Sequence, residues 1–97
     1  MKVIKKTFEF EWDKGNIGKN LSHHVEDQEA EEPFFDEDKV VYKDLLHSIK
    51  EERFILIGKS KQDRRLFISF TYRGKKIRII SVRDVNRKEV QLYEKAA

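Results

Sequence analysis

The chain has 97 residues, no cysteine and a formal net charge of +3 at pH 7. This length predicts one domain spanning residues 1–97, and the lack of cysteine excludes disulfide scaffolds and thiolate metal sites. No stretch approaches the roughly 20 apolar residues that a membrane-spanning helix needs. The N-terminal residues also lack the apolar core of a signal peptide. We therefore expect a cytoplasmic protein that does not associate with membranes.

The charge is strongly segregated along the chain. Residues 26–38 contain eight acids and no base, whereas residues 53–88 contain twelve bases and two acids, a formal charge of +10. A basic pole of this strength attracts phosphates by counterion release. The acidic stretch is interpreted either as a partner-facing feature or as solvated surface. Charge alone leaves nucleic-acid binding and an ordinary basic surface about equally open.

Hydropathy patterning in the first half predicts four elements. Residues 3–12 alternate between apolar and polar side chains, which is typical of a half-buried strand. A capping aspartate then opens a short helix over 13–21, and a second helix is predicted over 27–32, where Pro33 ends it. The middle segment is the hardest to assign, and we favour a strand over 40–46.

The second half has clearer signals. The predicted strands lie at 54–57, 66–72 and 77–83, with a glycine-containing hairpin turn at 73–76 and a final helix from residue 87. Asn86 and Glu89 have the spacing of a capping box at the start of that helix. The order β-α-α-β-β-β-β-α predicts an α+β fold: an antiparallel sheet with two short N-terminal helices and a C-terminal helix.

Short motifs along the chain resemble one known family. They are Phe10-Glu11-Trp12-Asp13, Lys19-Asn20, a histidine pair, Glu29-Ala30-Glu31-Glu32, Phe34-Phe35-Asp36, Glu52-Arg53-Phe54, Gly58, Leu66-Phe67, Thr71-Tyr72-Arg73-Gly74, Arg78-Ile79-Ile80-Ser81-x-Arg83, Lys88-Glu89 and Tyr93-Glu94. In their order and spacing, from about residue 8 to 95, they are similar to the BrnT toxins of type II toxin–antitoxin systems.

The resemblance implies a RelE-like fold and a metal-independent ribonuclease that inhibits translation. It also implies a BrnA-like antitoxin with a ribbon-helix-helix DNA-binding part, and a toxin–antitoxin hetero-oligomer that represses its own operon. No cofactor is expected. A zinc site is not expected either, because two adjacent histidines cannot easily share one metal and no cysteine or distant histidine has ligand spacing.

The chain departs from the family at the histidine motif. The family pattern Asn-x-x-Lys-His-x-Val is one residue shorter here, as Asn20-Leu21-Ser22-His23-His24-Val25. Counting forward from the asparagine aligns His24 with the family's histidine, and counting back from the valine aligns His23. Either imidazole can act as base or acid, because its unperturbed pKa lies near 6.5.

Metal-independent RNA cleavage needs a base, an acid and cations that stabilise the phosphorane. Besides the histidine pair, Glu29 is predicted as a base or an orienting group. Arg78 and Arg83 match the family's last-strand motif and suit a phosphate, because a guanidinium donates two parallel hydrogen bonds. On a flat strand these two positions face opposite sides, so both reach one phosphate only if a bulge or the strand end turns Arg83.

Other residues are predicted to contact RNA without cutting it. They are Arg53, Arg64, Arg65 and Tyr93. Such contacts position a backbone without reading its sequence. His47 lies outside every motif and is assigned no role. The alternative function, favoured by the altered histidine motif, is a non-catalytic RNA- or protein-binding module on the same fold.

Overall fold

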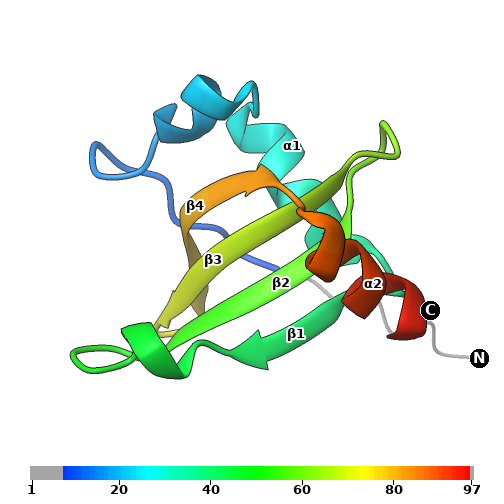
Figure 1. Ribbon diagram of the computed structural model, residues 1–97. Helices are drawn as coiled ribbons and strands as arrows, with labels where there is room; N and C mark the ends of the chain where they lie inside the picture. The colour runs from blue at the N-terminus through cyan, green and yellow to red at the C-terminus, as the bar shows by residue number, and fades with distance from the viewer. Residues whose placement is uncertain (1–7, 97) are drawn as a thin grey trace, which may run out of the picture.

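Four antiparallel strands form one sheet in the computed structural model, which describes residues 8–96 (Figure 1). The strands are β1 (Val40–Lys43), β2 (Arg53–Lys59), β3 (Arg65–Arg73) and β4 (Lys76–Asp84), in spatial order β1-β2-β3-β4. Each strand therefore pairs with its sequence neighbour in an antiparallel meander, and the predicted antiparallel sheet is confirmed. The tight β3–β4 turn uses Gly74 at φ +61°, a conformation that glycine adopts without strain.

Short helices precede and follow the sheet. They are η1 (Lys19–His23), α1 (Asp27–Glu31), η2 (Glu32–Phe35), η3 (Leu45–His47) and α2 (Arg87–Ala96), where η marks a 3-10 helix. At the start of α2, the Asn86 amide donates to Glu89 (2.9 Å) and the Glu89 amide donates to Asn86 (3.0 Å). The capping box is confirmed, and so is the α+β class.

Three local predictions need correction. The helix expected over 13–21 is a series of turns, because Gly18 takes φ +65° and η1 begins only at Lys19. The strand expected over 40–46 ends at Lys43, where the chain turns into η3. Of the strand expected over 3–12, residues 3–7 lie outside the described part, and the rest forms only an isolated parallel bridge, Phe10 to Ile77.

The sheet buries apolar side chains on both faces. One face packs against the N-terminal segments through Phe34, Leu56, Ile68, Phe70 and Ile79, all at most 2% exposed. The opposite face packs Ile55 and Ile57 beneath Tyr93 of α2. The continuous apolar run of β2 is therefore explained by burial on both sides. Figure 1 shows α2 over only one end of this second face, next to β1 and β2.

The edge strand β4 is irregular at Ile80. Ser69 pairs with Ser81 while its neighbour Phe70 pairs with Ile79, so Ile80 is an extra residue, a β-bulge. Two buried asparagines bond to the backbone on either side of the bulge. Asn16 donates its side-chain amide to the Ile79 carbonyl (3.1 Å), and Asn20 accepts from the Val82 amide (2.9 Å). The N-terminal segment thus holds the bulge in place.

Asn20→Ala is expected to lower the free energy of unfolding by about 1–3 kcal/mol, because it leaves the buried Val82 amide without its acceptor. Urea unfolding of this variant beside Ser22→Ala, an exposed position in the same helix η1, measures the difference. Equal stability of the two variants would show that the asparagine does not hold β4.

Candidate active site

The part of the sheet face that α2 leaves uncovered contains a cavity lined by both polar and apolar side chains. Its volume is about 340 Å³. The residues that line it come from β2, β3, β4 and the β1–β2 connection: Asp44, His47, Arg53, Ile55, Phe67, Ser69, Ile80, Ser81 and Arg83. Two arginines, a histidine and two hydroxyl groups at one cavity provide donors and a proton acceptor for a phosphate-bearing ligand.

The bulge sets the direction of Arg83. Beyond Ile80, Val82 joins Ile77 and Ile79 in the buried core, and Arg83 takes the opposite face, paired with Phe67. Its guanidinium lies 4.0 Å from the centre of the Phe67 ring and donates to both carboxylate oxygens of Glu89 (2.8 and 2.9 Å). These hydrogen bonds raise the pKa of Arg83 and lower the pKa of Glu89. The guanidinium is therefore a fixed positive charge at the cavity.

Arg53 reaches the same cavity but is paired more loosely. Its nearest carboxylate among the described residues is Glu51, with Nε 3.8 Å from Oε1. The Nε atom itself is buried and has no hydrogen-bond partner within residues 8–96. A buried donor without an acceptor costs free energy.

Arg78 faces the same side of the strand, opposite Thr71, but its guanidinium is held elsewhere. It donates to Glu11 (3.0 Å) and to both oxygens of Asp13 (2.8 and 2.9 Å). The bonds to Asp13 raise the pKa of Arg78 and lower the pKa of that aspartate. Arg78 does not line the cavity, and in this arrangement it ties the N-terminal segment to β4.

The predicted histidines and Glu29 lie in a different cluster, around Arg64. The Arg64 guanidinium donates to the backbone carbonyls of His24 (2.7 Å) and His23 (2.9 Å) and pairs with Asp84 (2.7 Å). Glu29 lies 3.4 Å from Arg64 and accepts from the Ser60 hydroxyl (3.0 Å). Arg64 thus fastens the end of η1 to the sheet, while both histidine side chains are exposed. None of these residues lines the sheet-face cavity.

Tyr93 and Arg65 pack beneath the C-terminal helix. Tyr93 is 3% exposed and donates its hydroxyl to Asp36 (2.6 Å). Burial and the bond to this carboxylate raise the pKa of Tyr93. Arg65 lies 5.9 Å from the centre of the Tyr93 ring and 3.4 Å from Glu94. The packing and the bond to Asp36 account for the position of Tyr93 without a ligand.

The structure brings His47, for which no motif predicts a role, to the cavity. Its Nδ1 lies 2.8 Å from Oδ2 of Asp44, three residues earlier in the chain. The available signal was the spacing Asp-x-x-His in a turn-forming segment, since residues three apart on a helical turn lie side by side. The imidazole reaches the sheet face because β1 ends at Lys43, where we had expected the strand to continue.

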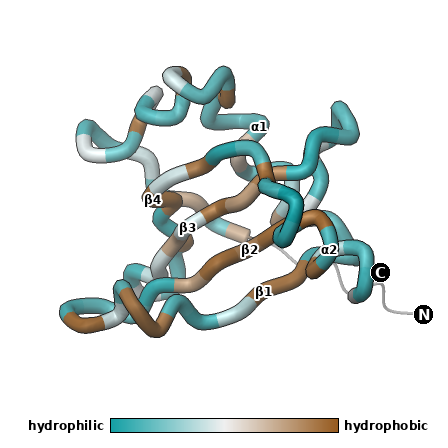
Figure 2. The backbone as a smooth tube through the Cα atoms, in the orientation of Figure 1, coloured by the Kyte–Doolittle hydropathy of each residue, from teal (hydrophilic) through white to brown (hydrophobic). Residues whose placement is uncertain are grey.

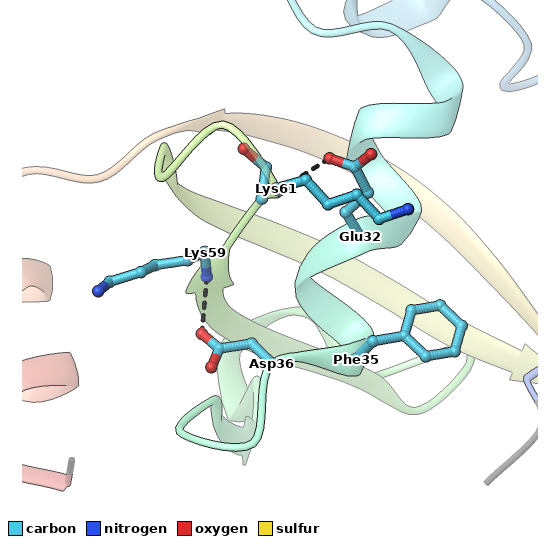
Figure 3. Close-up of a pocket in the computed structure, with 6 residues that line it drawn as sticks. Glu32, Phe35, Asp36, Lys59 and Lys61 are labelled. Atoms are coloured by element: carbon cyan, nitrogen blue, oxygen red, sulfur yellow. Dashed lines mark hydrogen bonds between the residues drawn. The ribbon is translucent and has the colours of Figure 1, made fainter. Parts of the chain in front are cut away.

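The acidic stretch 26–38 has a structural use. Five of its carboxylates bond to other segments: Asp27 to Gly18, Glu29 to Ser60, Glu31 to Trp12, Glu32 to Lys61 and Asp36 to Lys59. Figure 3 shows the bonds of Glu32 to Lys61 and of Asp36 to Lys59, at a second cavity between η2 and the β2–β3 turn. The volume of this cavity is about 610 Å³. No residue that we predicted to act on RNA lines this second cavity.

Residues 8–96 contain neither a metal-ligating cluster nor a membrane-spanning helix. No three histidine, cysteine, aspartate or glutamate side chains in this part of the chain are grouped so that they could hold a metal ion. No helix in the same range has the length and apolar character needed to cross a membrane.

The fold and the cavity define a small α+β protein with a cationic, hydroxyl-lined sheet face suited to a phosphate-bearing ligand. The family model described as "Ribonuclease toxin, BrnT, of type II toxin-antitoxin system" matches residues 12–89, and the chain belongs to this family. The match includes every residue that lines the sheet-face cavity. A search of curated proteins found no match.

The ion pair of Arg83 with Glu89 makes stability depend on pH. The pKa of Glu89 is lower in the folded chain than its ordinary value of 4.5. The pair therefore stabilises the fold above pH 4.5, and this contribution is lost as the pH falls through the lowered pKa. Glu89→Gln keeps a side chain that can complete the capping box. We expect it to cost about 1–2 kcal/mol at pH 7 and less below pH 4 in urea unfolding. A pH-independent difference would contradict this role.

Proposed function

We propose that this chain is an RNA-cleaving toxin that binds the scissile phosphate of RNA in the sheet-face cavity. The observation that carries the proposal is that Arg53 and Arg83 line one cavity together with the hydroxyl-bearing Ser69 and Ser81. Membership of a ribonuclease toxin family supports RNA as the substrate. The basic half of the chain adds long-range attraction for a polyanion.

Arg83 can bind a phosphate while it keeps its partner Glu89. A guanidinium has five N–H groups, and three hydrogen bonds of Arg83 run to Glu89 and the Asp84 carbonyl. The remaining N–H groups are available to an oxygen in the cavity. Two cations on a developing phosphorane stabilise its added charge, which is the largest contribution that a metal-independent ribonuclease needs.

The other residues predicted to act on RNA do not line the cavity. His23, His24 and Glu29 lie outside the cavity, around Arg64. If the histidine pair transfers a proton, as its motif predicts, the RNA must be bound over η1 rather than in the cavity. Arg64, Arg65 and Arg78 are paired with acids and are proposed to act mainly on the fold.

Membership of a type II toxin family also supports a protein antitoxin as partner and a cellular role for the proposed cleavage. A type II toxin is neutralised by a protein antitoxin, and we propose a BrnA-like ribbon-helix-helix protein for this role, in a toxin–antitoxin hetero-oligomer. The free toxin would act in the cytoplasm and inhibit translation by cutting RNA. The alternative is a non-catalytic RNA- or protein-binding module, which the shortened histidine motif favours.

RNA cleavage in EDTA by purified protein tests this proposal. Parent protein is expected to cut total RNA. Arg83→Ala is expected to lose about 100-fold or more of the rate, because it removes a cation from the phosphorane. Arg53→Ala is expected to lose about tenfold, mainly through weaker binding. Lys75→Ala, which removes a charge at the exposed hairpin turn, is the control and should cut like the parent.

The double variant His23→Ala/His24→Ala separates the two locations for the chemistry. Cleavage close to that of the parent would support the cavity, and loss of cleavage in this variant alone would move the site to η1. RNA binding by the parent without cleavage, at salt-sensitive affinity, would support the non-catalytic module instead.

A further inference from the structure

We propose that His47, oriented by Asp44, is the general base of the sheet-face site and removes the proton from the 2′-hydroxyl of the bound RNA. The inference rests on the proposed function, because it assigns a proton-transfer group to the cavity that is proposed to bind the scissile phosphate. His47 and Asp44 line this cavity together with Arg53 and Arg83.

The connection that carries His47 is tied at its base to the strand that carries Arg53. The Asp44 amide donates to the Arg53 carbonyl (2.8 Å), which continues the β1–β2 pairing by one residue. Ser48 closes the turn, because its hydroxyl donates to the Asp44 carbonyl and accepts from the Arg53 amide (3.0 Å). The imidazole and the Arg53 guanidinium are therefore positioned by the same hydrogen-bonded closure.

The Asp44–His47 pair has the arrangement of an oriented base. The Asp44 carboxylate is 16% exposed and lies 2.8 Å from Nδ1, whereas the imidazole is 63% exposed. A carboxylate at Nδ1 favours the tautomer with its proton on that nitrogen, which leaves a lone pair on Nε2 for a substrate proton. The same logic applies wherever an aspartate orients a catalytic histidine. Asp44 is a positioning residue and His47 touches the reacting group.

The step balances without any cofactor. Nε2 of His47 takes the proton of the 2′-hydroxyl, and the 2′-oxygen forms a bond to phosphorus. The bond from phosphorus to the 5′-oxygen breaks, and the leaving 5′-oxygen takes a proton from water. The resulting hydroxide accepts the proton held by His47. Arg53 and Arg83 stabilise the charge on the phosphorane, and the products are a 2′,3′-cyclic phosphate and a 5′-hydroxyl.

The segment around His47 packs little against the rest of the protein. Leu45, Leu46 and Ile49 are 77%, 83% and 91% exposed, and Figure 2 shows this segment as an apolar projection beyond the sheet. The imidazole therefore supports no core. Because of this, replacement of His47 should leave the fold intact, so cleavage can be compared at equal stability.

The test compares His47→Ala, Asp44→Asn and Arg83→Ala with the parent and with Asp38→Asn, an exposed aspartate outside the cavity that undergoes the same change in charge. His47→Ala is expected to cut about 100-fold or more slowly, as for loss of a general base. Its affinity for a 2′-O-methyl RNA, which cannot be cut, should equal that of the parent. Added imidazole should restore part of the rate of His47→Ala and none of the rate of Arg83→Ala.

Asp44→Asn is expected to lower the rate at saturating RNA about tenfold or more without changing binding, because the imidazole loses its fixed tautomer. Cleavage by His47→Ala at the parent's rate would overturn the inference, and so would a loss of rate that imidazole does not restore. In either case, loss of cleavage in Arg83→Ala would still support the proposed function. Failure of the parent to cut RNA would overturn both. Urea unfolding of every variant identifies a loss caused by misfolding.

Discussion

The irregularity of β4 at Ile80 determines which side of the sheet Arg83 reaches. If β4 alternated regularly through Ile80, Arg83 would share a face with Ile77 and Ile79 and would point into the core. An edge strand has an unpaired side that water or another segment must satisfy. Here the Asn16 side chain bonds to this unpaired edge just before the bulge, at Ile79, and the Asn20 side chain bonds to it just after, at Val82. The cavity on the opposite face therefore depends on two buried amides of the N-terminal segment.

The basic half of the chain is used in two different ways. Arg64 and Arg78 are neutralised by carboxylates of distant segments, so they hold the N-terminal segment against the sheet. Arg53 and Arg83 lie at the cavity, where Arg83 pairs closely with Glu89 (2.8 Å) and Arg53 lies 3.8 Å from Glu51. The formal charge of the sequence thus overstates the number of cations available to RNA. The acidic stretch 26–38 likewise serves the fold, since most of its carboxylates bond to other segments.

Local signals predicted most of the fold. The apolar run at residues 54–57, the hairpin at Gly74 and the capping box of Asn86 and Glu89 depend on near neighbours, and all three are confirmed. The bulge has no such signal, because Ile79-Ile80-Ser81 reads as regular strand and the asparagines that hold it lie about 60 residues earlier. The position of His47 depends on where β1 ends, and the strand propensity of residues 40–46 did not predict that end.

The most direct test of the central claim, that RNA binds in the sheet-face cavity, is the amide NMR spectrum of ¹⁵N-labelled protein titrated with a 2′-O-methyl oligonucleotide that cannot be cut. The account predicts that the largest shift changes fall on Arg53, Ser69, Ser81 and Arg83 and on the turn of His47, which line the cavity. Changes concentrated instead on η1 and the 60–64 turn, with the cavity residues unaffected, would contradict it.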